Sequence, residues 1–337
     1  MKAVGYRNSL PIDQADSLLD VDLPDPVAGP RDLIVSVKAV SVNPVDTKVR
    51  MRAAAEPGQF KVLGFDAAGL VKAVGQDVTL FKPGDEVFYA GSIARPGTNS
   101  ELHAVDERIA GPKPQSLNFA QAAALPLTSI TAWELLFDRL GLVPGDMQRK
   151  GVLLIIGGAG GVGSIMIQLA RKLTGLTVIA TASRPESRDW VLALGAHHAV
   201  DHTKPLVEQV RGLGFRHVEF IAGLTNTDQH FPAIAEIVAP QGKFGLIDDP
   251  KPFDIGAVKR KSVSIHWEFM FTRAVFETPD MVAQHHLLKR IAQMVDAGNV
   301  RTTLSGEFGT INAANLKRAH ALIESGRATG KVVLAGF

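Results

Sequence analysis

Five glycines lie within the ten residues IIGGAGGVGS, Ile155 to Ser164, directly after the apolar run GVLLII. The apolar run predicts a buried strand, and GVGSIMIQLARKL predicts a helix after it. Gly158, Gly160 and Gly163 fit the spacing G-x-G-x-x-G at this strand-to-helix turn. In such a turn the first glycine permits the tight bend, the second lets the backbone approach a pyrophosphate, and the third lets the helix pack on the strand. The turn therefore predicts a dinucleotide site.

The start of the predicted helix, at Gly161 and Val162, supplies further contacts to that site. The first N–H groups of a helix have no partner within the helix, and the helix dipole is positive at that end. We expect these N–H groups to meet the phosphates of the cofactor.

The pattern of the chain changes near residue 125. Before it, short alternating runs such as DLIVSVKAVSV and AAGLVKAVG are separated by turn signals such as DLPDPVAGP and FKPGDEV, which predicts a β-rich domain. From GVLLII onward, strand-like and helix-like runs alternate, which predicts βαβ units and a parallel sheet. Short β-like pieces, RTTLSGEFG and KVVLAGF, return near the end. We predict an α/β protein: a β-rich domain over 1–125, a doubly wound domain over 126–272, and a return to the first domain over 273–337.

Composition excludes several classes of protein. Cysteine is absent, which excludes disulfides, cysteine nucleophiles, iron–sulfur clusters and thiolate zinc sites. The net charge of +2 favours neither nucleic acid nor an anionic membrane. The start MKAVGYRNSL lacks the apolar core of a signal peptide, and no run approaches the roughly 18 apolar residues of a membrane span. We expect a cytoplasmic protein whose partner is a small molecule.

The end of the second strand of the predicted parallel sheet bears on the choice between NADH and NADPH. An NAD site has an Asp or Glu about 20 residues beyond the glycines, where it binds the ribose diol. Here the strand ends in ATASRPESR, with Ser183 and Arg184 at that place and Arg188 one turn later. A guanidinium binds a 2′-phosphate through charge-assisted hydrogen bonds, whereas a carboxylate repels it. We predict NADPH; alternatively Arg184 and Arg188 are a solvated helix start, and Glu186 nearby keeps NADH open.

Six motifs carry a family resemblance over nearly the whole chain: SVNPVDTKVR, LGFDAAGLV, FKPGDEVFYAG, LPLTSITAWELL, GGAGGVGS and ALIESGRATGKVVL. The chain resembles the medium-chain dehydrogenase/reductase superfamily, its quinone oxidoreductase branch, and within it the group known as zinc-type alcohol dehydrogenase-like proteins. The resemblance implies a GroES-like catalytic domain, formed from both chain ends, around a Rossmann domain, with the active site in the cleft.

The zinc ligands of zinc-dependent relatives are missing from this chain. The positions that match their cysteine, histidine and third ligand carry Asn43, Phe65 and Leu127, and the four-cysteine structural loop is absent. Asp46 and Asp66 remain, but two carboxylates with no histidine nearby make a poor tetrahedral zinc site. We expect no metal site.

Without a metal, the favoured chemistry is hydride transfer to an acceptor that is already electrophilic, such as a quinone or an α,β-unsaturated carbonyl. The cofactor brings the hydride, and the protein orients the acceptor and contacts the developing enolate oxygen. Asn43 is the first candidate for that region, because quinone oxidoreductases also carry Asn where zinc enzymes carry Cys; alternatively it only stabilises an Asn-Pro turn. By the same resemblance Asp46 and Lys48 line the cleft, although Asp46 could equally be structural. Thr131 is expected at the nicotinamide end, and Arg327 is a further candidate for the 2′-phosphate.

A proton donor is harder to assign, because the chain has only two tyrosines, Tyr6 and Tyr89. Enoyl thioester reductases of the superfamily use a tyrosine shortly after the Asn-Pro segment, where this chain reads RMRAAAEPGQF. The absence of a tyrosine there counts against a fatty-acyl thioester substrate. Tyr89, in EVFYAG, is a candidate for the cleft, with packing in a strand as the alternative. Solvent can also protonate an enolate or a hydroquinone.

Three functions therefore remain open. The favoured one is a zinc-free, NADPH-dependent reductase of quinones or enones. The second is an alcohol/aldehyde oxidoreductase in which hydrogen bonds replace zinc, and the third is an NADPH-binding regulatory protein without catalysis. The apolar run SVSIHWEFMF, the last predicted strand of the parallel sheet, predicts a homodimer, since it would otherwise leave an open sheet edge.

Overall fold

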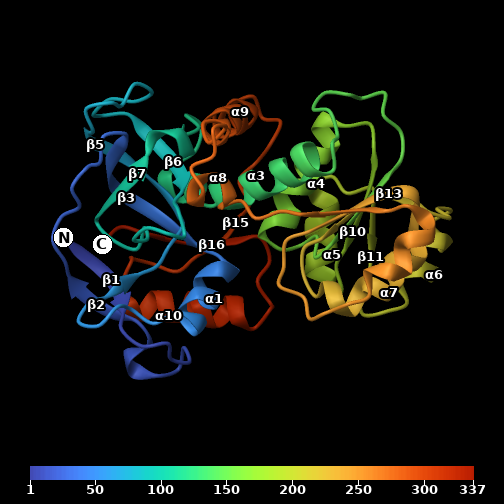
Figure 1. Cartoon of the computed structure of the whole chain (residues 1–337), viewed down its shortest axis with the longest axis horizontal. Coiled ribbons are helices and arrows are strands. Elements are labelled where there is room, and N and C mark those ends of the chain that lie inside the picture. The colour runs from blue at the N-terminus through green and yellow to red at the C-terminus, as the bar shows by residue number, and fades with distance from the viewer. The chain divides into compact units, whose positions relative to one another are not determined.

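The computed structural model describes residues 1–337, which divide into two compact units. The first unit consists of Met1–Ile130 and Phe271–Phe337, and the second of Thr131–Met270. The second unit is thus inserted into the chain of the first, as the colour sequence of Figure 1 shows.

The first unit is built on a seven-stranded sheet with the spatial order β15-β16-β3-β5-β6-β8, in which β7 also pairs with β3. The long strand β3 (Asp32–Val42) is rich in β-branched residues, which suit a pleated and buried surface. The C-terminal strand joins this sheet, because β16 (Lys331–Ala335) runs antiparallel to β3 with Val332 opposite Val42. A second sheet has the order β2-β1-β4. The other strands are β1 (Lys2–Tyr6), β2 (Leu19–Asp22), β4 (Lys61–Val62), β5 (Asp66–Val74), β6 (Glu86–Ala90), β7 (Leu102–Asp106), β8 (Ala110–Pro112) and β15 (Leu304–Glu307).

The helices of the first unit surround these sheets. Helix α1 (Pro44–Arg52) begins at a proline, whose fixed φ suits the first helical position. It packs against α10 (Ala313–Glu324), and the two lie side by side in Figure 1. The remaining helices are α2 (Phe119–Ala123), α3 (Pro126–Trp133, whose last residues belong to the second unit), α8 (Thr272–Val275), α9 (Ala283–Asp296) and the 3₁₀ helices η1 (Ala15–Ser17) and η2 (Glu107–Ile109).

The second unit contains a six-stranded parallel sheet with the order β11-β10-β9-β12-β13-β14. Counted from β9, this is the order 3-2-1-4-5-6 of a doubly wound sheet, in which ligands bind beyond the carboxyl ends of the strands at the reversal point. The predicted doubly wound domain is therefore confirmed. The strands are β9 (Val152–Ile156), β10 (Thr177–Thr181), β11 (His198–Val200), β12 (Val218–Gly223), β13 (Val238–Leu246) and β14 (Ser264–Trp267).

The strands of this sheet are connected mainly by helices. These are α4 (Gly161–Leu173), α5 (Pro185–Ala193), α6 (Leu206–Gly212), α7 (Thr227–Ile237) and the 3₁₀ helix η4 (Ile255–Lys261), while the π-helical segment η3 (Glu134–Arg139) precedes the sheet. None of the helices in either unit is long and apolar enough to cross a membrane.

Each unit has its own apolar core. In the first unit the core includes Val35 and Val40 of β3, and in the second it includes Leu154, Ile221 and Phe244 of three neighbouring strands. Burying one such side chain fully contributes about 1.5–3 kcal/mol. The strand ends that carry the candidate site residues are therefore held by core packing.

Two segments differ from the pattern in the sequence. The motif LPLTSITAWELL does not form a single helix but is divided between α3 and η3, and α3 begins at Pro126, which has no backbone N–H to continue a preceding helix. The last strand of the parallel sheet covers only Ser264–Trp267 of the longer apolar run.

Candidate functional site

The glycine turn after β9 has two positions where packing requires glycine. A Cβ on Gly158 would lie 2.7 Å from the Cβ of Ala180, and one on Gly163 would lie 2.5 Å from the carbonyl oxygen of Gly158. Gly160 differs, because a Cβ there would meet only the carbonyl oxygen of Gly157, at 3.5 Å. Gly158 thus allows the turn to pack on β10, Gly163 allows α4 to pack on the turn, and Gly160 leaves space beside the backbone.

This turn is joined to the neighbouring strand β10. The backbone N–H of Gly157 donates to Oγ1 of Thr181 over 3.0 Å, and the N–H of Gly158 donates to the carbonyl of Thr181 over 3.1 Å. Helix α4 starts at Gly161 with Gly160 as its N-cap and no side-chain cap. The N–H groups of Gly161 and Val162 therefore point out of the helix end, where they can bind a phosphate.

Ser183 and Arg184 lie just beyond the carboxyl end of β10, and both are half-buried. Arg184 is the N-cap of α5, and Ser187 fixes it by accepting from its N–H over 3.1 Å and donating to its carbonyl over 2.8 Å. Arg188 is exposed on the first turn of that helix. The glycine turn and these residues thus lie at the carboxyl ends of two adjacent parallel strands, β9 and β10.

The two remaining predicted cofactor residues are elsewhere in the chain. Thr131, on α3, is the first residue of the second unit and is only 5% exposed. Arg327 belongs to the first unit, where it is exposed after the end of α10. How either residue approaches a nucleotide remains a prediction.

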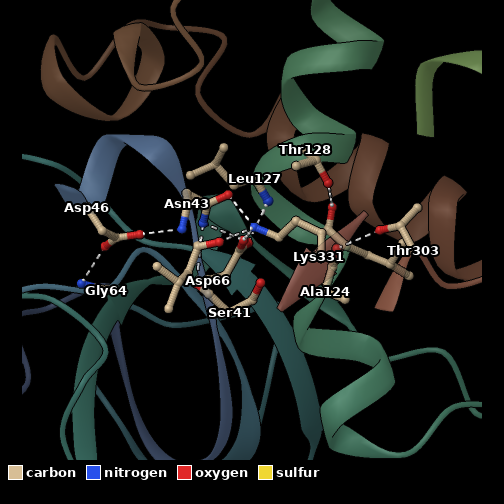
Figure 2. A network of polar contacts seen from close by, with 12 residues as sticks. Ser41, Asn43, Asp46, Gly64, Asp66, Ala124, Leu127, Thr128, Thr303 and Lys331 are labelled. Carbon is tan, nitrogen blue, oxygen red and sulfur yellow. Dashed lines mark hydrogen bonds and ion pairs between the residues drawn. The ribbon is translucent and has the colours of Figure 1, made fainter. Parts of the chain in front are cut away.

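A buried polar network lies in the first unit where α1, β5 and β16 meet (Figure 2). Nδ2 of Asn43 donates to Oδ2 of Asp66 over 2.7 Å, and Nζ of Lys331 donates to the same oxygen over 3.0 Å. Nζ of Lys331 also donates to Oδ1 of Asn43 and, over 3.1 Å, to the carbonyl of Val42. Asn43, Asp66 and Lys331 are 1%, 0% and 3% exposed. The partners fix the orientation of the Asn43 amide, with its oxygen toward the ammonium group.

Asp66 connects this network to helix α3. Its Oδ1 accepts from the backbone N–H of Leu127 over 2.7 Å, at the second residue of that helix. A carboxylate at a helix N-terminus satisfies an unpaired N–H and interacts favourably with the helix dipole. One buried carboxylate therefore connects β5 to Asn43, Lys331 and the start of α3, as Figure 2 shows.

The carboxylate of Asp46 is directed at the backbone. It accepts from the N–H of Asn43 over 2.7 Å and from the N–H of Gly64 over 2.9 Å, and it is 1% exposed. Burial raises the pKa of Asp46 to about 7, against the effect of these hydrogen bonds and of Lys331. This geometry matches the structural interpretation of Asp46.

Lys48 lies apart from the network, on the side of α1 that borders a hollow of about 460 Å³. The hollow is lined by Pro11, Ile12, Asp13, Thr47, Lys48, Met51, Arg52 and Glu324. It combines apolar walls with groups of both charges. Lys48 is thus the one predicted catalytic candidate beside this open space.

Tyr89 is 0% exposed, in the middle of the first unit. Its hydroxyl is 3.1 Å from Nδ1 of His103, whose Nε2 lies 3.0 Å from the carbonyl oxygen of Pro96. Burial raises the pKa of Tyr89 and lowers the pKa of His103 to about 4. This placement favours the packing interpretation of Tyr89 over a role as proton donor.

The zinc-ligand positions of zinc-dependent relatives do not form a metal site in this chain. Asn43 is committed to the network, Leu127 offers an aliphatic side chain, and Phe65 packs edge-on against Phe271 with ring centroids 5.2 Å apart. No group of three or more histidine or acidic side chains is arranged to hold a metal ion. The donor set therefore does not fit zinc.

Sequence reasoning missed Lys331, which supplies the cation of the network. The only signal was a lysine that opens the apolar strand KVVLA, where a buried charge requires a partner. For Asp66 the sequence pattern indicates only a carboxylate without a histidine nearby and gives no sign of its contact with α3.

Comparisons with known proteins agree with this architecture. Residues 29–115 match the GroES-like domain of alcohol dehydrogenases, and residues 194–334 match a zinc-binding dehydrogenase domain. A zinc-type alcohol dehydrogenase-like protein of Staphylococcus aureus is 38% identical over 337 residues, 99% of each chain. A 2-methylene-furan-3-one reductase of Solanum lycopersicum is 30% identical over 99% of this chain and 79% of its own.

Among solved structures, a protein from Rhizobium etli CFN 42, described as a zinc-dependent alcohol dehydrogenase, is 60% identical. The comparison covers 100% of this chain and 98% of that one, with a TM-score of 0.95. The predicted combination of a GroES-like and a Rossmann domain is thereby confirmed. The chain belongs to the medium-chain dehydrogenase/reductase superfamily of NAD(P)-dependent oxidoreductases, among the zinc-type alcohol dehydrogenase-like proteins.

Proposed function

We propose that the protein is an NADPH-dependent oxidoreductase that transfers a hydride to a quinone or an α,β-unsaturated carbonyl without a metal ion. The observation that carries this proposal is the network of Asn43, Asp66 and Lys331. It puts an amide and a buried ammonium group in the region where zinc-dependent relatives have metal ligands. An acceptor that is already electrophilic needs no metal to polarise it, so this substrate class suits the donor set best.

The cofactor site is proposed on the residues of the second unit. When bound, the reduced nicotinamide supplies the hydride. The space at Gly160 and the N–H groups of Gly161 and Val162 suit the pyrophosphate. The half-buried Arg184, with Ser183 beside it, suits the 2′-phosphate and supports NADPH over NADH.

The roles that we propose for residues of the first unit differ from those that the family resemblance implies. Both ends of the Asn43 amide are used inside the network, so we propose Asn43 as a positioning residue that holds the start of α1. Lys48, beside the hollow, is proposed as the charged group that faces the substrate. The product takes its proton from solvent. We further propose the cytoplasm as the location and a homodimer as the assembly.

The name of the tomato relative, a 2-methylene-furan-3-one reductase, supports an unsaturated ketone as acceptor. The names of the bacterial relatives support the second candidate, alcohol/aldehyde interconversion. The test is to follow the oxidation of NADPH by purified protein against quinones, enones and aldehydes, each with and without a chelator. Turnover of quinones or enones that survives chelation supports the proposal. Turnover of aldehydes alone favours the second candidate, and cofactor binding with no turnover favours a regulatory protein.

A further inference from the structure

A pair of buried carboxyl groups lies in the second unit, outside the site described above. Glu134 is the first residue of η3 and is 0% exposed, and Glu268, which directly follows β14, is 3% exposed. Nε of Arg139 donates to Oε2 of Glu268 over 2.8 Å, and its Nη2 lies 3.9 Å from Oε2 of Glu134. Two buried carboxyl groups therefore share one guanidinium.

The charges of Arg139 and the two glutamates sum to zero when the glutamates hold one proton. Two carboxylates close together in a buried site cannot both ionise easily, because each lacks water and repels the other. A proton on one of the two carboxyl groups removes this repulsion and leaves a single negative charge opposite Arg139. Burial and then Glu134 raise the pKa of Glu268, while Arg139 opposes that shift.

Two further titratable groups approach Arg139 from the neighbouring strands. Nζ of Lys243, on β13, donates to the carbonyl of Leu140 over 2.8 Å. Burial lowers the pKa of His266, on β14, and Lys243 and Arg139 lower it further. Of the two, Lys243 is hydrogen-bonded to a backbone carbonyl, and the lowered pKa of His266 favours its neutral form.

Glu268 lies at the same end of the parallel sheet as the glycine turn. The backbone N–H of Glu268 donates over 2.9 Å to the carbonyl of Leu246, the last residue of β13. Glu268 therefore stands at the carboxyl end of β14. The glycine turn and Arg184 belong to the first half of the sheet, β9 to β11, and β12 to β14 form the second mononucleotide half. Glu134 opens a π-helical segment, a geometry that is frequent at functional sites.

We propose, resting on the proposed function, that Glu134 and Glu268 hold one proton between them in the free protein and with NADPH, and lose it when NADP⁺ binds. The oxidised nicotinamide is positively charged and the reduced one is neutral, so a carboxylate at this end of the sheet favours the oxidised form. Thermodynamic linkage then requires that NADP⁺ binding releases a proton from the pair. Only an O–H bond breaks, and the proton passes to solvent.

The test counts protons by titration calorimetry of the full-length protein with NADP⁺ and with NADPH. Each titration is run near pH 8 in two buffers of different ionisation enthalpy. Both cofactors carry the 2′-phosphate, so its protonation cancels in the difference between them. We expect NADP⁺ to release a fraction of a proton more than NADPH, and its Kd to fall by several-fold as pH rises from about 7 to 9, within the limit of tenfold per pH unit.

Glu268→Gln keeps the shape of the protonated pair and should abolish the difference in proton count. Glu208→Gln, at an exposed position on α6, is the matched control and should keep it. Equal proton counts for both cofactors in the unmodified protein would overturn the inference and leave the proposed function intact. A difference that persists in Glu268→Gln would also overturn it. Failure to bind either cofactor would overturn both.

Discussion

The ammonium nitrogen of Lys331 lies 3.0 Å from Oδ2 of Asp66 in the interior of the first unit, and both side chains are excluded from solvent. A buried ion pair of this kind is weak evidence for stability, because desolvation opposes the attraction. Its role here is to position neighbouring groups, because the pair holds Asn43 on one side and the start of α3 on the other.

Lys331→Met should therefore destabilise the protein by about 3–5 kcal/mol, because it leaves the charge of Asp66 buried without its cation. The double variant Lys331→Met/Asp66→Asn removes both charges and should recover much of that loss. Urea unfolding monitored by circular dichroism measures the free energies. Lys82→Met is the control, because Lys82 pairs with Asp85 at the surface with 80% of its side chain exposed, and such pairs contribute about 0–1 kcal/mol. Equal losses for Lys331→Met and Lys82→Met would contradict this account.

The fold was more predictable from the sequence than this network. Alternating apolar runs and the glycine turn indicate where the strands lie along the sequence, because such signals are local. Asn43 and Lys331 are 288 positions apart in the chain, and no local pattern indicates that they meet. Tyr89 illustrates a second limit: the last four residues of β6 are all buried, so alternation could not tell which of its faces is covered.

The glycines at 160 and 163 should respond differently to alanine. Gly163→Ala brings a Cβ to 2.5 Å from a backbone oxygen, and overpacking of this kind costs about 1–3 kcal/mol in stability. Gly160→Ala has space and a φ of −72° that alanine adopts freely, so the melting temperature of the free protein should change little. The stabilisation by added NADPH should nevertheless fall, because the new methyl group occupies the phosphate side. Thermal shift with and without NADPH measures both effects, and an unchanged NADPH shift in Gly160→Ala would contradict this placement of the cofactor.

Arg184→Ala should raise the KM for NADPH at least tenfold and leave that for NADH within about threefold. One lost hydrogen bond to a charged partner is worth about 1.5–3 kcal/mol, and each 1.36 kcal/mol is about one decade. Steady-state kinetics with both cofactors provides the measurement. Arg216→Ala is the control, because Arg216 is exposed just before β12, at the end of the sheet where the strands begin. A parallel rise for both cofactors would mean that Arg184 supports the loop instead of reading the phosphate.

His320 should make the stability of the protein depend on pH. Nη1 of Arg50 lies 3.2 Å from its Nδ1, and burial, with Arg50, lowers the pKa of His320 from 6.5 to about 3. The unfolded chain therefore binds a proton below pH 6.5 that the folded protein does not bind until about pH 3. Stability is fully present above pH 6.5 and falls with decreasing pH by up to about 1.4 kcal/mol per unit from this group.

His320→Asn keeps an acceptor for Arg50 and should reduce the slope of that acid limb, to which His103 also contributes through its lowered pKa. The free energy of unfolding, measured in urea at several values between about pH 4.5 and 7, gives the slope. His286→Asn, at an exposed position on α9, should leave the slope unchanged. The same slope in His320→Asn and the unmodified protein would show that another group controls acid stability.

The open edge of the parallel sheet predicts the oligomeric state. Strand β14 pairs with β13 on one side only, and Trp267 and Phe269 beside it are 58% and 49% exposed. An unpaired edge with exposed aromatic side chains favours pairing with a second chain, and a lysine on such an edge opposes it. Sedimentation at micromolar concentration should therefore give about twice the chain mass of 36.0 kDa. Trp267→Lys should shift the protein to the monomer. Phe276→Lys is the control and should not, because Phe276, although 73% exposed, belongs to the first unit and not to this strand. A monomeric mass for the unmodified protein would mean that the edge is protected in another way.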